Sequence, residues 1–269
     1  MMSRTLRQTG FGVSFLLFGM GGIVLSYLFF PIIFILYRQK EERQDICQYW
    51  ISSCFTLFVK FLEILRIVSI DTINKNRLDT SGGVLVIANH PTLIDVVIII
   101  SHLRQCDCIV KSSLWKNPFV RHVISMAGYI PNEAPDILER CNQKLSAGRK
   151  LLVFPEGTRT EPGEKVHCQR GAAQLAVRCG AEYQRILITS YPAILYKGIP
   201  WYQVPSCKPV IELNVMECES VSPFLQGASS ASIAARRLTR YFDVALEPSY
   251  VSELLDIEDF AVGNARKQN

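Results

Sequence analysis

The chain has 269 residues, of which 49% are hydrophobic and 20% are charged, and its formal net charge is +5. This composition excludes a disordered or repetitive protein and is typical of one sizeable globular domain with an appendage. The modest positive charge fits an anionic membrane surface or a phosphate-bearing substrate, and it gives no support to nucleic acid as a partner.

Nine cysteines are scattered along the chain without a paired C-x-x-C spacing, which is typical of buried thiols in a reducing compartment. His102, Cys106 and Cys108 form a cluster that could be taken for a metal site. These residues are crowded on one short segment and no second pair of ligands follows, whereas zinc ligands ordinarily come as spaced pairs. We therefore expect no bound metal.

An uncharged run of 27 residues, from Phe11 to Tyr37, follows Arg4 and Arg7 near the start of the chain. About 20 apolar residues are enough for a helix to cross a bilayer. A cleaved signal peptide would be shorter and would end at a small-residue cleavage site. We expect residues 1–70 to form a membrane-anchoring helical region, which either spans the bilayer or enters it as a shallow re-entrant element. The residues that would bend such a helix are Gly19, Gly21, Gly22 and Pro31.

A second apolar stretch, Tyr49 to Ile70, carries Lys60, Glu63 and Arg66 at spacings of three residues. On a helix this spacing places the three charges on one side. The remaining apolar face is expected to lie along the membrane interface.

From Asp71 onward, strand-like and helix-like segments alternate. We expect strands at 83–88, 106–110, 129–130, 150–154, 185–189 and 210–215, and helices at 93–103, 114–126, 134–148, 170–179 and 230–246. Such alternation predicts an α/β domain over residues 71–269, with a mostly parallel central sheet flanked by helices. We expect Trp201 and Tyr202 to be buried, with a place at the membrane interface as the alternative.

The segment Asn89-His-Pro-Thr-Leu-Ile-Asp95 begins where the first of these strands ends. A histidine held by a carboxylate is a poised general base, and Pro91 favours a loop conformation in which His90 can reach Asp95. The alternative is a capping box, in which Thr92 begins a helix and Asp95 completes the cap. The segment alone favours neither interpretation.

The segment Val153-Phe-Pro-Glu-Gly-Thr-Arg-Thr160 follows another strand. Gly157 would let a substrate approach backbone N–H groups, which stabilise an oxyanion. Arg159 carries a planar group that matches phosphate oxygens. The alternative is an ordinary polar turn in which Glu156 and Arg159 pair with each other.

Taken together, Asn-His-x4-Asp and the later Phe-Pro-Glu-Gly-Thr-Arg resemble the glycerolipid acyltransferase family. The best-known members of this family are the 1-acyl-glycerol-3-phosphate acyltransferases. The segments Val110–Phe119 and Ala127–Ile130 lie between the two motifs in the order that the family shows. The similarity runs from about Val84 to Lys197.

This resemblance implies phospholipid biosynthesis by transfer of a fatty acyl group from a thioester, acyl-CoA or acyl carrier protein, to a hydroxyl of a membrane lipid such as 1-acyl-glycerol-3-phosphate. His90 would remove the hydroxyl proton, and Asp95 would orient His90 and stabilise its charge. The chemistry requires no metal or other cofactor. Because acyl carriers are cytosolic and the acceptor is a lipid, we expect the protein at the cytoplasmic face of a membrane, the inner or cytoplasmic membrane.

The resemblance also implies a set of residues that bind the substrates. Amides near Gly157 would hold the oxyanion, and the neighbouring side chains would shape the acceptor site, with Lys111 adding positive charge near a phosphate. The set is Lys111, Glu156, Gly157, Thr158 and Arg159.

One departure from the family concerns the acceptor. Typical members follow the Gly-x-Ile segment with an arginine that helps to hold the acceptor phosphate, whereas this chain reads Gly128-Tyr-Ile-Pro-Asn132 and then Glu133. The departure favours, as an alternative, acyl transfer to a lipid hydroxyl without a phosphate. Two further alternatives are a thioesterase or lipid hydrolase, in which His90 activates water, and a membrane scaffold without catalysis.

Overall fold

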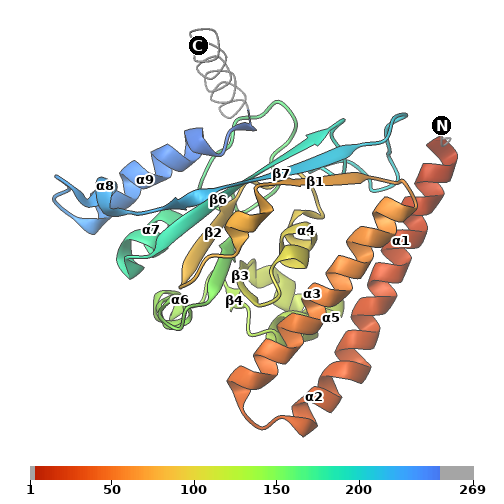
Figure 1. Ribbon diagram of the computed structural model, residues 1–269, viewed down its shortest axis with the longest axis horizontal. Coiled ribbons are helices and arrows are strands. Elements are labelled where there is room, and N and C mark those ends of the chain that lie inside the picture. The colour runs from red at the N-terminus through yellow and green to blue at the C-terminus, as the bar shows by residue number, and fades with distance from the viewer. Residues whose placement is uncertain (1–3, 249–269) are drawn as a thin grey trace, which may run out of the picture.

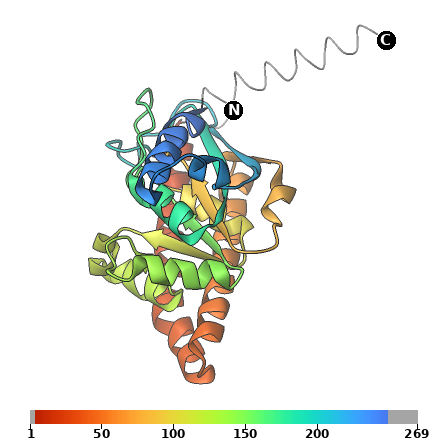
Figure 2. The same cartoon turned by 90° about the vertical axis from the view of Figure 1, so that its left-hand side faces the viewer.

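The computed structural model describes residues 4–248, which form a seven-stranded sheet between two layers of helices (Figures 1 and 2). The strands are β1 (Ser69–Ile73), β2 (Val84–Ala88), β3 (Cys106–Val110), β4 (Ile130–Pro131), β5 (Lys150–Val153), β6 (Glu182–Tyr191) and β7 (Val210–Glu219). The α-helices are α1 (Arg4–Val24), α2 (Phe30–Leu36), α3 (Lys40–Ile64), α4 (Asp95–His102), α5 (Pro118–Met126), α6 (Ile137–Ser146), α7 (Arg170–Cys179), α8 (Ser222–Leu225) and α9 (Ala231–Ala245). A π-helix η1 (Leu25–Phe29) joins α1 to α2, and two 3-10 helices are η2 (Lys75–Leu78) and η3 (Ser112–Lys116).

The strand order is β1-β7-β6-β2-β5-β3-β4, and all neighbours are parallel except β6 and β7, which pair antiparallel. The mostly parallel sheet flanked by helices is therefore confirmed. All five residues of β2 are buried because helices cover both faces of the sheet, so this strand is continuously apolar. The carboxyl ends of β2, β5 and β3 meet at one edge of the sheet.

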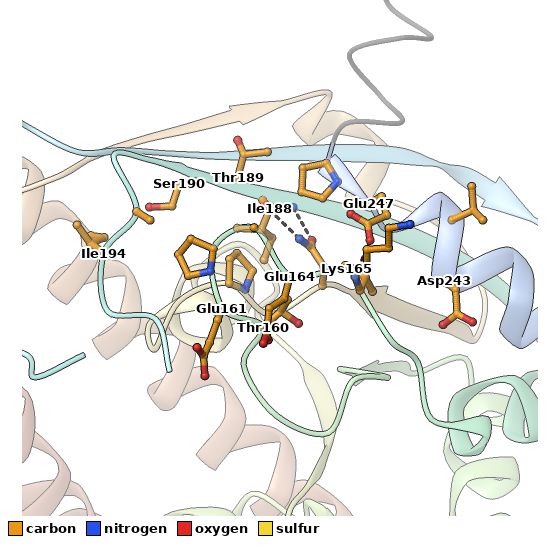
Figure 3. Close-up of a pocket in the computed structure, with 18 residues that line it drawn as sticks. Thr160, Glu161, Glu164, Lys165, Ile188, Thr189, Ser190, Ile194, Asp243 and Glu247 are labelled. Carbon is orange, nitrogen blue, oxygen red and sulfur yellow. Dashed lines mark hydrogen bonds between the residues drawn. The ribbon is translucent and has the colours of Figure 1, made fainter. Parts of the chain in front are cut away.

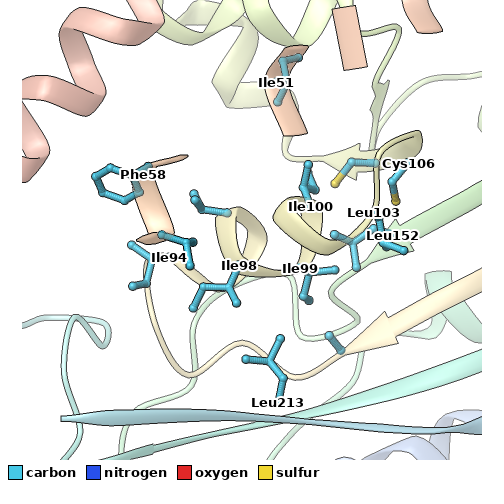
Figure 4. Packing of buried hydrophobic residues seen from close by; sticks show 14 of the residues in the cluster. Ile51, Phe58, Ile94, Ile98, Ile99, Ile100, Leu103, Cys106, Leu152 and Leu213 are labelled. Carbon is cyan, nitrogen blue, oxygen red and sulfur yellow. The ribbon is translucent and has the colours of Figure 1, made fainter. Parts of the chain in front are cut away.

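Each face of the sheet has its own hydrophobic core, and β2 contributes alternate residues to both. Val86 faces the core beneath α1, α3, α4 and α5, and Leu85 faces the core beneath α6, α7 and α9. Figure 4 shows Ile98 of α4 packed between Phe58 of α3 and Leu213 of β7. Because α4 is buried between a helix and the sheet, its first residue, Asp95, has a fixed position.

The N-terminal segment is one long helix made of α1, η1 and α2, and α3 returns antiparallel beside it (Figure 1). The 33 residues from Arg4 to Leu36 have a mean hydropathy of 2.2 over their most apolar window, which is long and apolar enough to cross a membrane by length and composition. Phe11 and Phe30 pack against the protein. Many of its other large apolar side chains are exposed, among them Leu16, Met20, Tyr27, Leu28 and Ile35.

The second apolar stretch contains a long helix and, at its end, a strand that was not predicted. The apolar face of α3 that includes Phe58 and Leu62 packs on the protein core, whereas Leu57 and Ile64 are exposed, so a contact of α3 with the membrane interface stays a prediction. Its end, Ser69–Ile73, forms β1, which pairs with β7 at the edge of the sheet. Strand β1 contains both residue 70 and residue 71, and α3 shares a hydrophobic core with α4. The domain boundary expected between residues 70 and 71 stays a prediction.

Three other predictions need correction. The helix expected at 114–126 is divided into η3 and α5, because Pro118 restricts Asn117 to an extended conformation with φ −83° and ψ 114°. Helix α6 begins at Ile137, since residues 132–136 form turns and irregular backbone after β4. Trp201 and Tyr202 are exposed by 47% and 53%. The sequence also predicts a loosely held polar tail after residue 246, which falls largely outside the described residues.

Candidate active site

Both sequence motifs leave the sheet at the same edge. Strands β2 and β5 are direct neighbours, with Ile87 opposite Val153. His90 and Glu156 each follow three residues after these paired positions. The parallel pairing therefore brings together two turns that are far apart in the sequence.

His90 and Asp95 form the pair that the sequence predicted. His90 Nδ1 lies 2.8 Å from Asp95 Oδ2, and the Asp95 side chain is fully buried while 20% of the His90 side chain is exposed. The Thr92 N–H donates to Asp95 Oδ2 at 2.7 Å, and the Thr92 hydroxyl donates to Asp95 Oδ1. The cap and the histidine–carboxylate pair therefore coexist. Because the carboxylate accepts from Nδ1–H, the lone pair of Nε2 is left to act as a base.

Glu156 fixes the backbone of His90 from the other side. The His90 N–H donates to Glu156 Oε1 at 2.7 Å, and the Thr160 hydroxyl donates to Glu156 Oε2. The Thr160 N–H in turn donates to the His90 carbonyl at 3.1 Å. Glu156 is only 5% exposed, and this burial raises its pKa to about 7, although the hydrogen bond from the His90 N–H acts in the opposite direction. The contact between Glu156 and His90 is therefore made to the backbone of His90.

Arg159 does not pair with Glu156, so the polar-turn alternative is wrong on this point. Its Nη1 donates to the carbonyls of Leu195 and Tyr196, at 2.8 and 3.2 Å. These carbonyls belong to the loop between β6 and β7. Part of the guanidinium thus holds that loop beside the site, and its role toward a phosphate stays a prediction.

Gly157 lies in the turn with φ +70°, a conformation that glycine adopts without strain. A side chain there would have room, since the nearest atom to an added Cβ is 3.8 Å away, so the backbone angle is the reason for glycine. Its N–H donates to the Phe154 carbonyl at 3.2 Å. This bond occupies the Gly157 amide itself, while Thr158 is exposed beside it.

Lys111 follows β3 at the same edge, with an exposed side chain. Strand β3 is separated from β2 by β5, so about 10 Å lies between their axes. Asn132, which follows the Gly128-Tyr-Ile-Pro segment, accepts from the Ser112 N–H and hydroxyl at 2.9 and 3.0 Å. This asparagine therefore ties η3 to the end of β4.

Two residues of the site were not singled out from the sequence. The buried side-chain amide of Asn89 accepts from the Ile188 N–H at 2.7 Å and donates to the Ile188 carbonyl at 2.8 Å, which joins β2 to β6. The Phe154 ring stacks on the His90 ring, with 4.4 Å between centroids. Asn89 and Phe154 both lie inside the two motifs, but their partners become apparent only in the fold.

A cavity of about 780 Å³ lies behind the turns that follow β2 and β5, between these turns and the end of α9 (Figure 3). Asn89, Pro91 and Thr160 line it, and His90 and Asp95 do not. Its wall also carries carboxylates, two of which bind backbone N–H groups: Asp243 accepts from Cys168 and Glu247 accepts from Val166. The cavity is thus adjacent to the histidine–carboxylate pair without containing it.

The cluster of His102, Cys106 and Cys108 has other partners. His102 Nε2 lies 3.0 Å from Thr72 Oγ1, and burial lowers the pKa of His102 to about 4. Burial raises the pKa of the Cys106 thiol to about 12. Within residues 4–248, no group of three or more histidine, cysteine or acidic side chains is placed to hold a metal ion.

The mostly parallel α/β domain thus places a histidine–carboxylate pair beside the Phe-Pro-Glu-Gly-Thr-Arg turn. The acyltransferase family model matches residues 69–194, a segment that contains both motifs. This match agrees with the resemblance to the glycerolipid acyltransferase family that the two motifs indicate.

Individual similar proteins agree with this resemblance. A 1-acyl-sn-glycerol-3-phosphate acyltransferase of Helicobacter pylori is 29% identical over 64% of this chain and 72% of its own length. The chloroplastic enzyme LPAT1 of Arabidopsis thaliana, which carries the same description, is 25% identical over 63% of this chain and only 47% of its own length. The crystal structure of the Thermotoga maritima acyltransferase PlsC has a TM-score of 0.70 at 20% identity, covering 93% of this chain and 97% of that one. The structural likeness shows a shared fold.

Proposed function

We propose that the protein transfers a fatty acyl group from an acyl thioester to the free hydroxyl of a lysophospholipid such as 1-acyl-glycerol-3-phosphate, in phospholipid biosynthesis. The observation that carries this proposal is the 2.8 Å contact between His90 and the fully buried Asp95 at a strand end. The match to the acyltransferase family model and the described activities of the relatives support the choice of reaction.

The proposed reaction needs no nucleophile from the protein. The acceptor hydroxyl gives its proton to His90 Nε2 as its oxygen attacks the thioester carbonyl carbon. The C–O bond forms, the C–S bond breaks, and the leaving thiolate takes the proton back from the imidazolium. Asp95 stabilises this imidazolium throughout, as the acid behind the histidine of a serine hydrolase does.

The carbonyl oxygen becomes an oxyanion during the attack and needs hydrogen-bond donors. Since the Gly157 N–H is bound to Phe154, the donor that we assign at this turn is the neighbouring amide of Thr158. We assign the binding of the acceptor phosphate to the Lys111 ammonium group and to the remaining N–H groups of the Arg159 guanidinium. Glu156 acts by keeping the His90 backbone in place.

The reaction is assigned to the cytoplasmic face of a membrane, with acyl-CoA or acyl carrier protein as the donor. The exposed apolar helix from Arg4 to Leu36 supports membrane attachment. The acceptor would then lie in the same bilayer that holds this helix.

A panel of acceptors tests the proposal. Purified protein in lipid–detergent micelles is given a labelled acyl thioester, on CoA and on carrier protein, with lysophosphatidate, other lysophospholipids, a hydroxyl lipid without phosphate, or no acceptor. Acyl transfer to lysophosphatidate is the expected result. Free fatty acid released without any acceptor would overturn acyl transfer in favour of a hydrolase.

The same panel of acceptors also tests a second candidate for the acceptor lipid. The Gly128-Tyr-Ile segment is followed by Pro131, Asn132 and Glu133 and not by the arginine that the resemblance implies, and this departure favours a lipid hydroxyl without a phosphate as the acceptor. Acylation of that lipid alone, with lysophosphatidate ignored, would replace the first candidate by this one.

A further inference from the structure

The loop between β6 and β7, residues 192–209, is hydrogen-bonded at its start to the two turns that carry the proposed active site, residues 89–95 and 154–160, which we call the catalytic turns. The Leu195 carbonyl accepts from the Leu93 N–H at 3.0 Å, and Leu93 lies between His90 and Asp95. The same carbonyl accepts from Arg159 Nη1 at 2.8 Å. The position of this loop and the position of the catalytic turns are therefore linked.

Further along, the same loop is bound to the N-terminal end of α1 (Figure 1). Arg7 is only 2% exposed, and its Nη1 donates to the carbonyls of Pro205 and Cys207 at 2.7 and 2.6 Å. Gln8 Nε2 donates to the Tyr202 carbonyl at 3.0 Å. A continuous series of contacts thus runs from α1 through the loop to the catalytic turns.

Two large aromatic side chains are exposed on this loop. Trp201 is 47% exposed and Tyr202 is 53% exposed. The Trp201 ring packs against Gly12 and lies 6.1 Å from the Phe15 ring. These residues of α1 begin its apolar part, directly after its polar first turns. Tryptophan and tyrosine favour this level of a bilayer, where apolar chains meet polar headgroups.

The charge around these aromatic residues is positive. The loop contains Lys197 and Lys208 and no acidic residue, and residues 1–37 contain no acidic residue either. Lys208 and Arg4 are exposed. Lys197 has an acidic neighbour in Glu161, whose Oε1 lies 3.8 Å away. Basic side chains next to exposed aromatic rings fit the anionic headgroups of a lipid surface.

We propose that residues 196–208 form a second membrane contact, in which Trp201, Tyr202 and Lys208 lie at the headgroup level of an anionic bilayer. The contact is continuous with the apolar surface of α1, and it holds the catalytic turns at the level where a lysolipid presents its hydroxyl. This last consequence rests on the proposed function, whereas the contact itself is independent of catalysis.

Fluorescence of a single tryptophan tests the contact. Trp50→Phe with Trp115→Phe leaves Trp201 as the reporter in the full chain, which is reconstituted in phosphatidylethanolamine–phosphatidylglycerol vesicles. Lipids brominated near the headgroup should remove more Trp201 emission than lipids brominated near the chain end. Equal emission with and without brominated lipids would overturn the proposal.

A matched control places a tryptophan away from the proposed surface. Ile233 is 36% exposed on α9, at the opposite end of the molecule from α1 (Figure 1). In a protein that carries Trp50→Phe, Trp115→Phe, Trp201→Phe and Ile233→Trp, brominated lipids should leave the emission unchanged. Quenching equal to that of Trp201 would mean general adsorption and would contradict the assigned surface.

A turnover measurement then separates the contact from the chemistry. For Trp201→Ser with Tyr202→Ser, we expect a roughly tenfold loss of turnover on acceptors in vesicles, which corresponds to about 1.4 kcal/mol. Turnover on a monomeric short-chain acceptor should be unchanged. Equal losses on both acceptors would show an effect on folding or catalysis and would overturn the membrane role. The fluorescence result stands even if no acyl transfer is found.

Discussion

His90 is held by two carboxylates that act on different parts of the residue. Asp95 binds the ring, and Glu156 binds the backbone N–H. Both acids were singled out from the sequence, because they lie in motifs that follow strands. The partner of Asn89 was not predictable, since Ile188 lies 99 residues away and no local pattern connects the two.

We expect Asp95→Asn to lower kcat by roughly a hundredfold or more, because an amide cannot stabilise the imidazolium that forms on His90. The measurement is kcat of the purified variant, together with its melting temperature. Thr92→Ser keeps the hydroxyl that binds Asp95 and serves as the control with near-normal kcat. A normal kcat in Asp95→Asn would contradict the role given to this carboxylate.

Glu156 should make the stability of the protein depend on pH. Burial raises its pKa from 4.5 to about 7, so the fold favours the protonated acid. Its stabilising contribution is complete below about pH 4.5 and is lost as the pH rises through about 7, for a total on the order of 3 kcal/mol.

Glu156→Gln resembles the protonated acid at every pH and so isolates this contribution. Relative to the variant, the wild-type protein should lose stability between about pH 4.5 and pH 7. Thermal unfolding of both proteins in one detergent, across this range, is the measurement. A stability difference that stays constant with pH would refute the raised pKa.

At the scale of elements, the buried strands were predicted most reliably. Strand β3 matches its predicted bounds, and β2 and β5 agree within one residue at either end, because parallel strands covered on both faces are short apolar runs. Strand β1 was missed because it continues the apolar stretch of the preceding helix without a break in hydrophobicity. Its strand conformation depends on pairing with β7, which lies far along the chain.

Gly83, which directly precedes β2, lies close to the end of α6. A Cβ added at Gly83 would lie 1.9 Å from the backbone oxygen of Leu145, which cannot move aside as a flexible side chain would. We expect Gly83→Ala to lower the free energy of unfolding by about 1–3 kcal/mol or more. Denaturant unfolding measures the loss.

Gly171 in α7 offers the matched control, because an added Cβ there meets nothing within 4 Å. Gly171→Ala should leave stability unchanged or raise it by up to about 1 kcal/mol, since alanine favours a helix. Equal effects of the two substitutions would contradict the close approach of α6 to β2.

At the scale of the whole molecule, a buried ionic network joins α3 to the sheet. Asp107 of β3 is fully buried, and it binds Arg149, Lys144 and Gln48. Arg149 also donates to Gln48 Oε1 at 2.7 Å and to Asp45. The sequence indicated the long N-terminal helix, but it could not indicate this network, whose members come from four separate segments.

We expect Arg149→Met to destabilise the protein by about 3–5 kcal/mol, because it leaves the charge of Asp107 buried without its closest partner. The double variant Arg149→Met with Asp107→Asn should recover part of this loss. Arg140→Met, which breaks an exposed ion pair with Asp136 at 4.0 Å, is the control and should cost less than about 1 kcal/mol. Similar losses of unfolding free energy in Arg149→Met, in the double variant and in Arg140→Met would argue against the network.

The most direct measurement concerns the proton taken by His90. Wild-type protein and His90→Ala are compared in the same lipid–detergent micelles for thiol release from acyl-CoA and acyl carrier protein, with and without lysophosphatidate. We predict thiol release by the wild-type protein only when the acceptor is present, and background release by His90→Ala at an unchanged melting temperature. Acceptor-dependent thiol release that persists in His90→Ala would contradict the assignment of His90 as the general base.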